Sequence, residues 1–441
     1  FFFRFMGVVS QLLSGRILLF LLITVLTAGF LNIYFSKRVD IPEHMLHNPS
    51  VFMENLLTSQ QGDTLMNLAK EMKEFPVNTQ DLKFYKTKHE HIGEALPINS
   101  DGKCDHPYMV PSVNGTECVL AGRIDIGRHY ILGGGVQGLK ESYEDLVSRL
   151  LSFGRYIFDP TKYEIVNELF NSENFQNAAK SVCPVDKQVL DPFQFNFIVQ
   201  VPGQTVALHV DGVYFWGATR FQFPQWLLAV MEYSGLFQED FIDQIQVVGY
   251  FHSWNPIPER GGNFVYWDTS DPIPRSVPPM PLAGSIVDGS KTVHAATVYQ
   301  PQVKAPKCDK SAETKLVYVG NEEWELYSDG NIVEKYKTDD LRWTIVYRAR
   351  CFASKEEVDR FYNLPESDIK KLEDVLDILE KDLISKGKLD EKKELNRLDL
   401  AMLLLDEYIK YPLSPTAIIP YNYCALSKLM PFTKPLLSLI C

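Results

Sequence analysis

Short apolar runs dominate the middle of the chain. Between residues 195 and 352, β-branched and aromatic residues form runs that Gly, Pro and Asp interrupt, a pattern typical of strands joined by tight turns. The runs lie at 195–201, 205–211, 244–254, 261–267, 284–289, 292–299, 315–320, 324–336 and 342–352. Ser-Asp-Gly-Asn at 328–331 favours a hairpin turn. Many short strands at this spacing predict an antiparallel barrel or a double-sheet jelly roll.

Helical patterns flank and interrupt this β region. Apolar residues recur at three- and four-residue spacing over 139–158 and 162–182, which predicts helices there, and a further helix is expected at 224–237. After residue 352, Ser354 and Glu357 fit a capping box. Helical spacing then continues through Ile369, Leu372, Leu376, Leu379 and Leu383. The fold class expected is mainly β with flanking helices (α+β) and a C-terminal helical region.

The N-terminal part begins with an apolar stretch. The residues between Arg16 and Lys37 are uncharged and span about the length of a membrane-crossing helix. A cleaved signal peptide is the alternative, but Leu26 fits the small-residue cleavage rule poorly and the apolar run continues beyond it. We expect an uncleaved signal-anchor that attaches the protein to a membrane. We expect five segments: a short N-terminal piece (1–15), the anchor (16–36), a stem (37–120), the β domain with its N-terminal helices (121–352) and the helical tail (353–441).

Composition narrows the classes of function. The 441 residues suffice for a large core, and the hydrophobic fraction of 45% is that of a globular protein. The formal net charge of −12 disfavours a general nucleic-acid binder, which needs a basic surface to displace counterions from phosphates. We therefore expect no nucleic-acid partner.

The cysteines and a glycosylation sequon bear on the compartment. Cys104 and Cys118 bracket a loop that contains Asn114, the acceptor of an Asn-Gly-Thr sequon. Downstream of an anchor, these signals together favour an oxidising environment. We expect a Cys104–Cys118 disulfide, a glycan on Asn114 and a catalytic domain on the lumenal side of the ER or Golgi, or outside the cell.

The chemistry centres on two histidines and an aspartate. His209 and Asp211 are two residues apart on an expected strand, so they share one face, and His294 lies on another expected strand. This composition is the two-histidine, one-carboxylate set that binds non-haem iron and leaves positions open for a co-substrate and O2. The alternative is a hydrogen-bonded structural pair with His294 as an ordinary core histidine.

Four sequence motifs in order resemble the prolyl 4-hydroxylase-like branch of the Fe(II)- and 2-oxoglutarate-dependent oxygenases. They are PGQTVALHVD, VVGYFHSWNPIPERGGNFVYW, PLAGSIVDGSKTVHAA and LRWTIVYRARCF, within residues 202–352. The chain departs from that family in carrying Gln200 in place of a tyrosine and Arg342 in place of a lysine. The long gap between His294 and Arg342 indicates an inserted hairpin.

The resemblance implies a double-stranded β-helix fold and a dioxygenase activity with Fe(II) and 2-oxoglutarate as cofactors. Ascorbate is a further candidate cofactor. It places iron on His209, Asp211 and His294, and the distal carboxylate of 2-oxoglutarate on Arg342 and Thr344. Arg348 shares the strand face of Arg342 and is its rival. Tyr214, Trp216 and Arg220 follow the ligands and are candidates for a substrate wall.

The substrate remains open between a protein side chain and a small molecule. Two other classes compete with the oxygenase: a non-catalytic metal-binding barrel that serves as a binding module, and a cupin enzyme that uses a metal without 2-oxoglutarate. Arg342 separates them, because a metal barrel without the co-substrate has no need of a buried guanidinium.

Overall fold

The computed structural model describes most of the chain from residue 40 onward. The described residues are 20, 22–29, 40–77, 95–112, 115–132, 143–271, 273–308, 313–412, 422, 424, 432 and 434–437. Within them, no helix is both long enough and apolar enough to cross a membrane. Most of the anchor expected over 16–36 lies outside the described residues, and so does Asn114.

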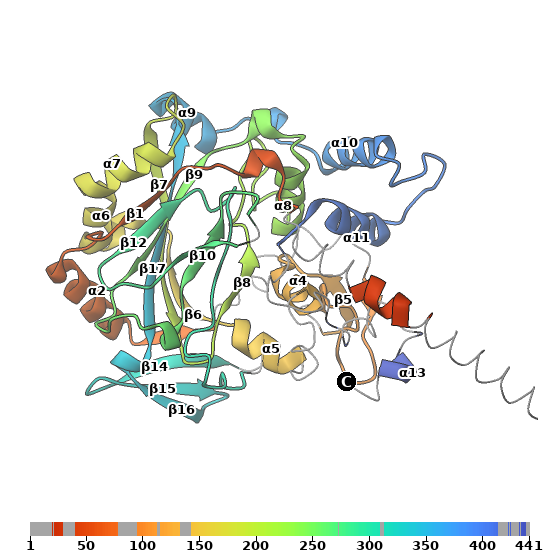
Figure 1. Ribbon diagram of the computed structural model, residues 1–441. Coiled ribbons are helices and arrows are strands. Elements are labelled where there is room, and N and C mark those ends of the chain that lie inside the picture. The colour runs from red at the N-terminus through yellow and green to blue at the C-terminus, as the bar shows by residue number, and fades with distance from the viewer. Residues whose placement is uncertain are drawn as a thin grey trace, which may run out of the picture.

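Two antiparallel sheets form the β core (Figure 1). The larger sheet has six strands in the order β1-β12-β9-β17-β7-β6, and the smaller has four in the order β11-β10-β13-β8. The larger sheet contains β1 (Ser50–Met53), β6 (Phe153–Ile157), β7 (Val189–Gln200), β9 (Gln244–Tyr250), β12 (Gly284–Val287) and β17 (Arg342–Phe352). The smaller contains β8 (Val206–His209), β10 (Phe264–Trp267), β11 (Arg275–Val277) and β13 (Val293–Ala296).

From β7 to β17 the chain crosses repeatedly between these two sheets: β7, β9, β12 and β17 belong to the larger, while β8, β10, β11 and β13 belong to the smaller. Val248 and Tyr250 of β9 pack with Phe264 and Tyr266 of β10, so apolar contacts join the two sheets. The expected class of mainly antiparallel strands with flanking helices is confirmed.

The alternation of side chains along β17 explains how one strand serves both the core and a cavity. Trp343, Ile345 and Tyr347 are fully buried in the apolar layer on one face. Because successive side chains point to opposite faces, the residues between them face the other way, toward the smaller sheet. Arg342, Thr344 and Arg348 lie on that second face and line a cavity.

Two groups of helices cover the sheets. The first packs its apolar side chains on the outer face of the larger sheet, and Figure 1 shows α6 and α7 along that side; it comprises α2 (Ser59–Met72), α6 (Glu164–Asn171) and α7 (Glu173–Val182). The second shares a core with residues after β8 and comprises α4 (Asp125–Leu132), α5 (Tyr143–Leu150), α8 (Gln225–Ser234), α10 (Leu372–Ser385) and α11 (Arg397–Tyr408). The helical tail also contains α9 (Lys355–Tyr362), capped by Ser354 as expected, and α13 (Lys434–Leu437).

The helix expected over 139–158 is only partly correct. Helix α5 ends at Leu150, and β6 then pairs with the edge of β7. Burial does not alternate along β6: Phe153, Gly154 and Ile157 are buried and Arg155 is exposed. This segment is a strand because it pairs with β7, so its own sequence period did not mark the change from helix to strand.

A third sheet contains the inserted hairpin. Its order is β16-β15-β14-β2, with β2 (Glu74–Pro76), β14 (Thr314–Gly320), β15 (Glu323–Ser328) and β16 (Asn331–Lys337). Asp329 and Gly330 both have positive φ, 47° and 77°, as the tight hairpin turn requires. The hairpin therefore lies in the gap between His294 and Arg342, where the motifs indicated an insertion.

The residues expected to form a separate stem are partly integrated into the β domain. Strand β1 pairs with β12 of the larger sheet, and β2 pairs with β14 of the third. A small sheet follows in the order β3-β5-β4, with β3 (Leu96–Pro97), β4 (Met109–Pro111) and β5 (Glu117–Leu120). A boundary at residue 121 therefore does not separate a stem from the domain. The polar composition of 37–120 did not reveal these pairings because such short strands carry little pattern.

Candidate active site

Strand register brings the two histidines together. Strand β13 pairs antiparallel with β8, and His294 lies opposite His209. The two rings lie with their centroids 4.2 Å apart. Asp211 follows directly after β8, and its backbone N–H donates to the carbonyl of Gly289 at 2.8 Å. One potential ligand atom from each of His209, Asp211 and His294 lies within 4.8 Å of the others.

Both histidines present the same nitrogen to this cluster. Nδ1 of His209 lies 2.8 Å from the carbonyl of Ala207, and Nδ1 of His294 lies 2.8 Å from that of Thr292. A carbonyl can only accept, so Nδ1 carries the proton and Nε2 keeps its lone pair. Burial lowers the pKa of His209 to about 4 and also lowers the pKa of His294, so both rings are neutral at pH 7. Neutral imidazoles oriented through Nδ1–H are the form that binds metals.

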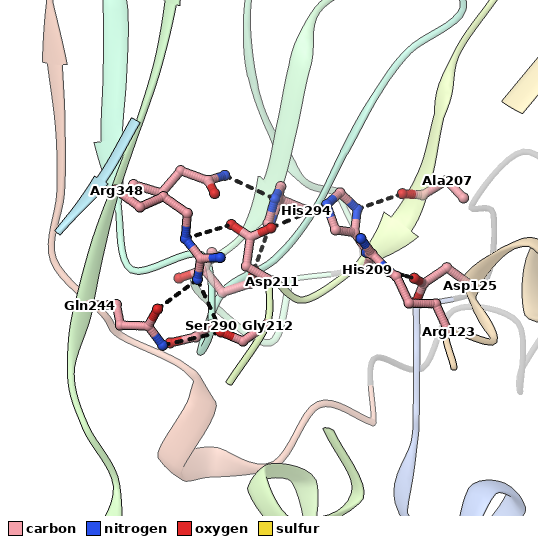
Figure 2. A network of polar contacts seen from close by, with 12 residues as sticks. Arg123, Asp125, Ala207, His209, Asp211, Gly212, Gln244, Ser290, His294 and Arg348 are labelled. Carbon is pink, nitrogen blue, oxygen red and sulfur yellow. Dashed lines mark hydrogen bonds and ion pairs between the residues drawn. The ribbon is translucent and has the colours of Figure 1, made fainter. Parts of the chain in front are cut away.

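Asp211 supplies the negative charge. Burial alone would raise the pKa of Asp211, but Arg348 and the two histidines outweigh it and the pKa is lowered. Oδ1 is 3.8 Å from Nε2 of His209, while Oδ2 is 3.8 Å from Nε of Arg348. Figure 2 shows the carboxylate between Arg348 on one side and the histidine rings on the other. Oδ2 is buried without a hydrogen-bond partner.

These residues fit a divalent metal. Two neutral imidazole nitrogens and an ionised carboxylate are the donors that non-haem Fe(II) takes. Oδ1 lies on the histidine side of the Asp211 carboxylate and is the oxygen placed to complete this donor set.

Arg348 is held in place by neutral groups. Nη2 donates to the carbonyl of Gly212 at 3.1 Å and to Oε1 of Gln244 at 2.7 Å. Its guanidinium also lies over the ring of Phe193, 5.2 Å from the centroid. Arg348 therefore belongs to the metal end of the cavity, beside Asp211.

Arg342 lies further along the same strand face and is only 3% exposed. Nε donates to the carbonyl of Gly262 at 2.9 Å, and Nη1 donates to Gln200 Oε1 at 2.7 Å and to Thr344 Oγ1 at 2.9 Å. Nη2 approaches the hydroxyl of Tyr250 at 3.3 Å.

All these partners are neutral, and no described carboxylate forms an ion pair with Arg342. Burial lowers the pKa of the guanidinium, while Tyr250 and Tyr299 oppose that shift. A buried cation without an anion is unfavourable. Nε2 of Gln200 is a further buried donor without a partner beside it. This end of the cavity is therefore suited to a carboxylate.

One cavity of about 220 Å³ connects the two ends. Its lining includes His209, Asp211 and His294 at one end and Arg342 and Thr344 at the other. The sequence motifs had singled out all five residues.

The three residues expected to contact substrate have different positions. Tyr214 and Arg220 line the cavity. Trp216 does not: it packs against Phe352 and Phe361, and Arg360 lies over its ring at 4.8 Å. The chain turns sharply after β8, with the backbone of Phe215 bonded to that of Ala218, and Trp216 packs on the aromatic cluster that contains Tyr214 without reaching the cavity lining.

Sequence reasoning missed two polar residues of β9. Gln246 lies 3.2 Å from Nε2 of His294 through its amide nitrogen, and Tyr250 contacts Arg342. They are four residues apart on a strand and so share a face. Side chains alternate between the two faces of the strand over 244–250, and this alternation is the sequence signal that could have placed both residues on the cavity side.

Two disulfides join pairs of described cysteines, and Cys424 is disulfide-bonded as well. Cys104 and Cys118 are bonded to each other, as the sequence led us to expect. Cys183 and Cys351 form a second bridge, which ties the end of α7 to β17 across a sequence separation of 168 residues. Because the two cysteines are so far apart along the chain, local spacing did not indicate this second pair.

Comparison with known proteins finds solved structures of similar fold but no matching family model or curated protein. Similar solved structures include a prolyl-4-hydroxylase from Pseudomonas putida, at 10% identity over 69% of this chain and 92% of that one, with a TM-score of 0.31. A viral collagen prolyl hydroxylase from Paramecium bursaria Chlorella virus 1 has 9% identity over 68% and 95%, with a TM-score of 0.28.

A third, HygX from Streptomyces hygroscopicus with nickel and 2-oxoglutarate bound, has 7% identity over 69% and 83%, with a TM-score of 0.30. These structures are of the kind that the sequence motifs resemble. At such low identity and TM-score the likeness carries no argument about function, which rests on the site itself.

Proposed function

We propose that this chain is an Fe(II)- and 2-oxoglutarate-dependent dioxygenase built on a double-stranded β-helix. The observation that carries the proposal is the pairing of two features in one cavity: a His-Asp-His cluster at one end and a buried Arg342 without an anionic partner at the other. The repeated crossing of the chain between two antiparallel sheets supports the fold.

In this proposal, His209, Asp211 and His294 hold the iron. When bound, the iron supplies the oxidising chemistry, in which O2 and 2-oxoglutarate are converted with a C–H substrate into the hydroxylated product, succinate and CO2. The protein positions the reactants. Arg342 binds the distal carboxylate of 2-oxoglutarate through a charge-assisted hydrogen bond from Nη2, and the hydroxyl of Thr344, which accepts from Nη1, assists by donating its own proton.

The substrate is a molecule that inserts one group into the cavity. The volume of about 220 Å³ is small beside the roughly 300–1,000 Å³ of pockets that enclose drug-sized ligands, and the co-substrate takes up part of it. Tyr214 and Arg220 are the candidates for contact with that group. A protein side chain suits these dimensions better than a whole small molecule does.

The paired cysteines support a lumenal or extracellular location, because disulfides persist in oxidising compartments. If that location is correct, protein from a eukaryotic secretory host has a glycosidase-sensitive mass increment that Asn114→Gln removes. Fully reduced cysteines in that preparation, together with no mass change on digestion, would contradict it.

A redox-inert metal provides the test of the site. Mn(II)-loaded protein under nitrogen should bind 2-oxoglutarate in a calorimetric titration, and omitting the metal should weaken that binding. Binding of 2-oxoglutarate that is the same with and without metal, and the same in His209→Ala, would refute the proposed arrangement. It would then favour a barrel that does not use the co-substrate.

A further inference from the structure

The turn that precedes His294 also contacts Asp211. Asp288 fixes this turn: its Oδ1 accepts the backbone N–H of Ser290 at 2.9 Å, and its carbonyl accepts that of Thr292 at 2.9 Å. Oδ2 of Asp288 further accepts the backbone N–H of Gln244, which ties the turn to β9. Gly289 lies inside this fixed turn and is buried.

Gly289 leaves the space that the Asp211 carboxylate occupies. A Cβ atom added to Gly289 would lie 2.5 Å from Oδ2 of Asp211 and 3.2 Å from the amide of Gln246. A carbon and an oxygen that are not bonded cannot approach to 2.5 Å, so the carboxylate would have to move. The φ angle of Gly289 is not in the left-handed region, so its backbone would accept alanine. The absence of a side chain is therefore required by the neighbour and not by the backbone.

The same oxygen faces Arg348, while the other oxygen faces His209. We propose that Gly289 is a positioning residue for the metal site: its bare Cα allows Oδ2 to lie beside Arg348, and this directs Oδ1 toward the metal and the histidines. The inference rests on the proposed metal site and adds a residue that itself offers the metal no side-chain ligand.

Co(II) titration of the full-length protein, followed through its visible d–d absorption, tests this role. Gly289→Ala should weaken Co(II) affinity about 10- to 100-fold, the range for residues that orient a metal ligand. It should also change the d–d spectrum, because the carboxylate is displaced.

Gly249→Ala is the matched control. A Cβ at Gly249 would also meet a side-chain atom at 2.5 Å, but that atom is Cδ2 of Leu56 in the apolar core. The two variants therefore introduce comparable crowding, and Gly249→Ala should keep its Co(II) affinity within about twofold of the parent. Equal weakening in both would show that the effect is general destabilisation, which would overturn the proposal.

A double-mutant cycle shows whether Gly289 acts through Asp211. Asp211→Ala should weaken Co(II) binding by itself, and adding Gly289→Ala should then change the affinity by less than about twofold. If Gly289→Ala alone does not fold, the double variant should recover folding because the clash partner is gone; failure of both to fold would refute the proposed contact.

The outcomes separate the two proposals. If Asp211→Ala leaves Co(II) affinity unchanged, the metal site itself is wrong. If Asp211→Ala weakens binding but Gly289→Ala binds Co(II) as the parent does, only the role of Gly289 is wrong.

Discussion

Replacing Arg342 tests the co-substrate end of the cavity. Its guanidinium is bonded to neutral groups, namely Gly262, Gln200, Thr344 and Tyr250. The energy that 2-oxoglutarate gains is therefore that of adding an anion to a preoriented cation. Hydrogen bonds to a charged group contribute about 1.5–3 kcal/mol. Arg342→Ala should thus raise the dissociation constant of 2-oxoglutarate about tenfold to 150-fold.

Two further variants refine the magnitude. Arg342→Lys should recover only part of the affinity, because an ammonium is a point charge that cannot keep the contacts with Gly262 and Gln200 that orient the guanidinium. Thr344→Val removes one neutral hydroxyl and should weaken binding about two- to tenfold, corresponding to about 0.5–1.5 kcal/mol.

The assay is calorimetric titration of 2-oxoglutarate into Mn(II)-loaded protein under nitrogen. Arg260→Ala is the control, since Arg260 lies over Trp254 at 4.4 Å and is absent from the cavity lining. It should bind 2-oxoglutarate as the parent does. Unchanged affinity in Arg342→Ala, or the same loss in both variants, would refute the assignment of Arg342.

Two other predictions concern stability. Burial raises the pKa of Glu232 on α8 to about 8 from its ordinary value of 4.5. Between about pH 5 and 8 the folded state therefore keeps a proton that the unfolded state has released. The free energy of unfolding should fall as the pH rises across this range. Glu232→Gln should remove up to about 4 kcal/mol of that fall in urea unfolding across this range; parallel curves for parent and variant would contradict it. Replacing Cys183 and Cys351 by serine should lower stability by about 2 kcal/mol more than replacing Cys104 and Cys118, because sequence separations of 168 and 14 residues give loops of very different closure entropy. Equal losses in urea unfolding would show that chain entropy does not govern the difference.

The sequence predicted which residues form the site better than it predicted the contacts that hold them in place. His209 and Asp211 could be placed on one face from the period of a strand, and Arg342 and Thr344 from their place at the start of another. The pairing of His294 opposite His209 depends on strand register between distant segments, which a single sequence does not determine. The contacts of Arg342 with Gly262 and Tyr250 arise from a third strand and a loop, so they too needed the fold.

Local pattern also had limits elsewhere. Phe153–Ile157 follows a helical stretch without a breaker strong enough to mark the change to a strand. Strands β1 and β2 are only four and three residues long and gain their order from their partners in the sheets. Trp216 follows Tyr214 at strand spacing and packs on the same aromatic cluster, but the chain turns at Phe215–Ala218 and only Tyr214 lines the cavity.

Anaerobic titration of Fe(II) and 2-oxoglutarate reports on the proposed iron site itself, because only a metal chelated by the co-substrate gives a weak visible charge-transfer band. The parent protein should develop this band, saturating at one iron and one 2-oxoglutarate per chain, and Asp211→Ala and His209→Ala should not develop it at the same concentrations. A parent protein without the band, or a band of equal intensity in both variants, would contradict the claim that His209, Asp211 and His294 hold an iron that binds 2-oxoglutarate.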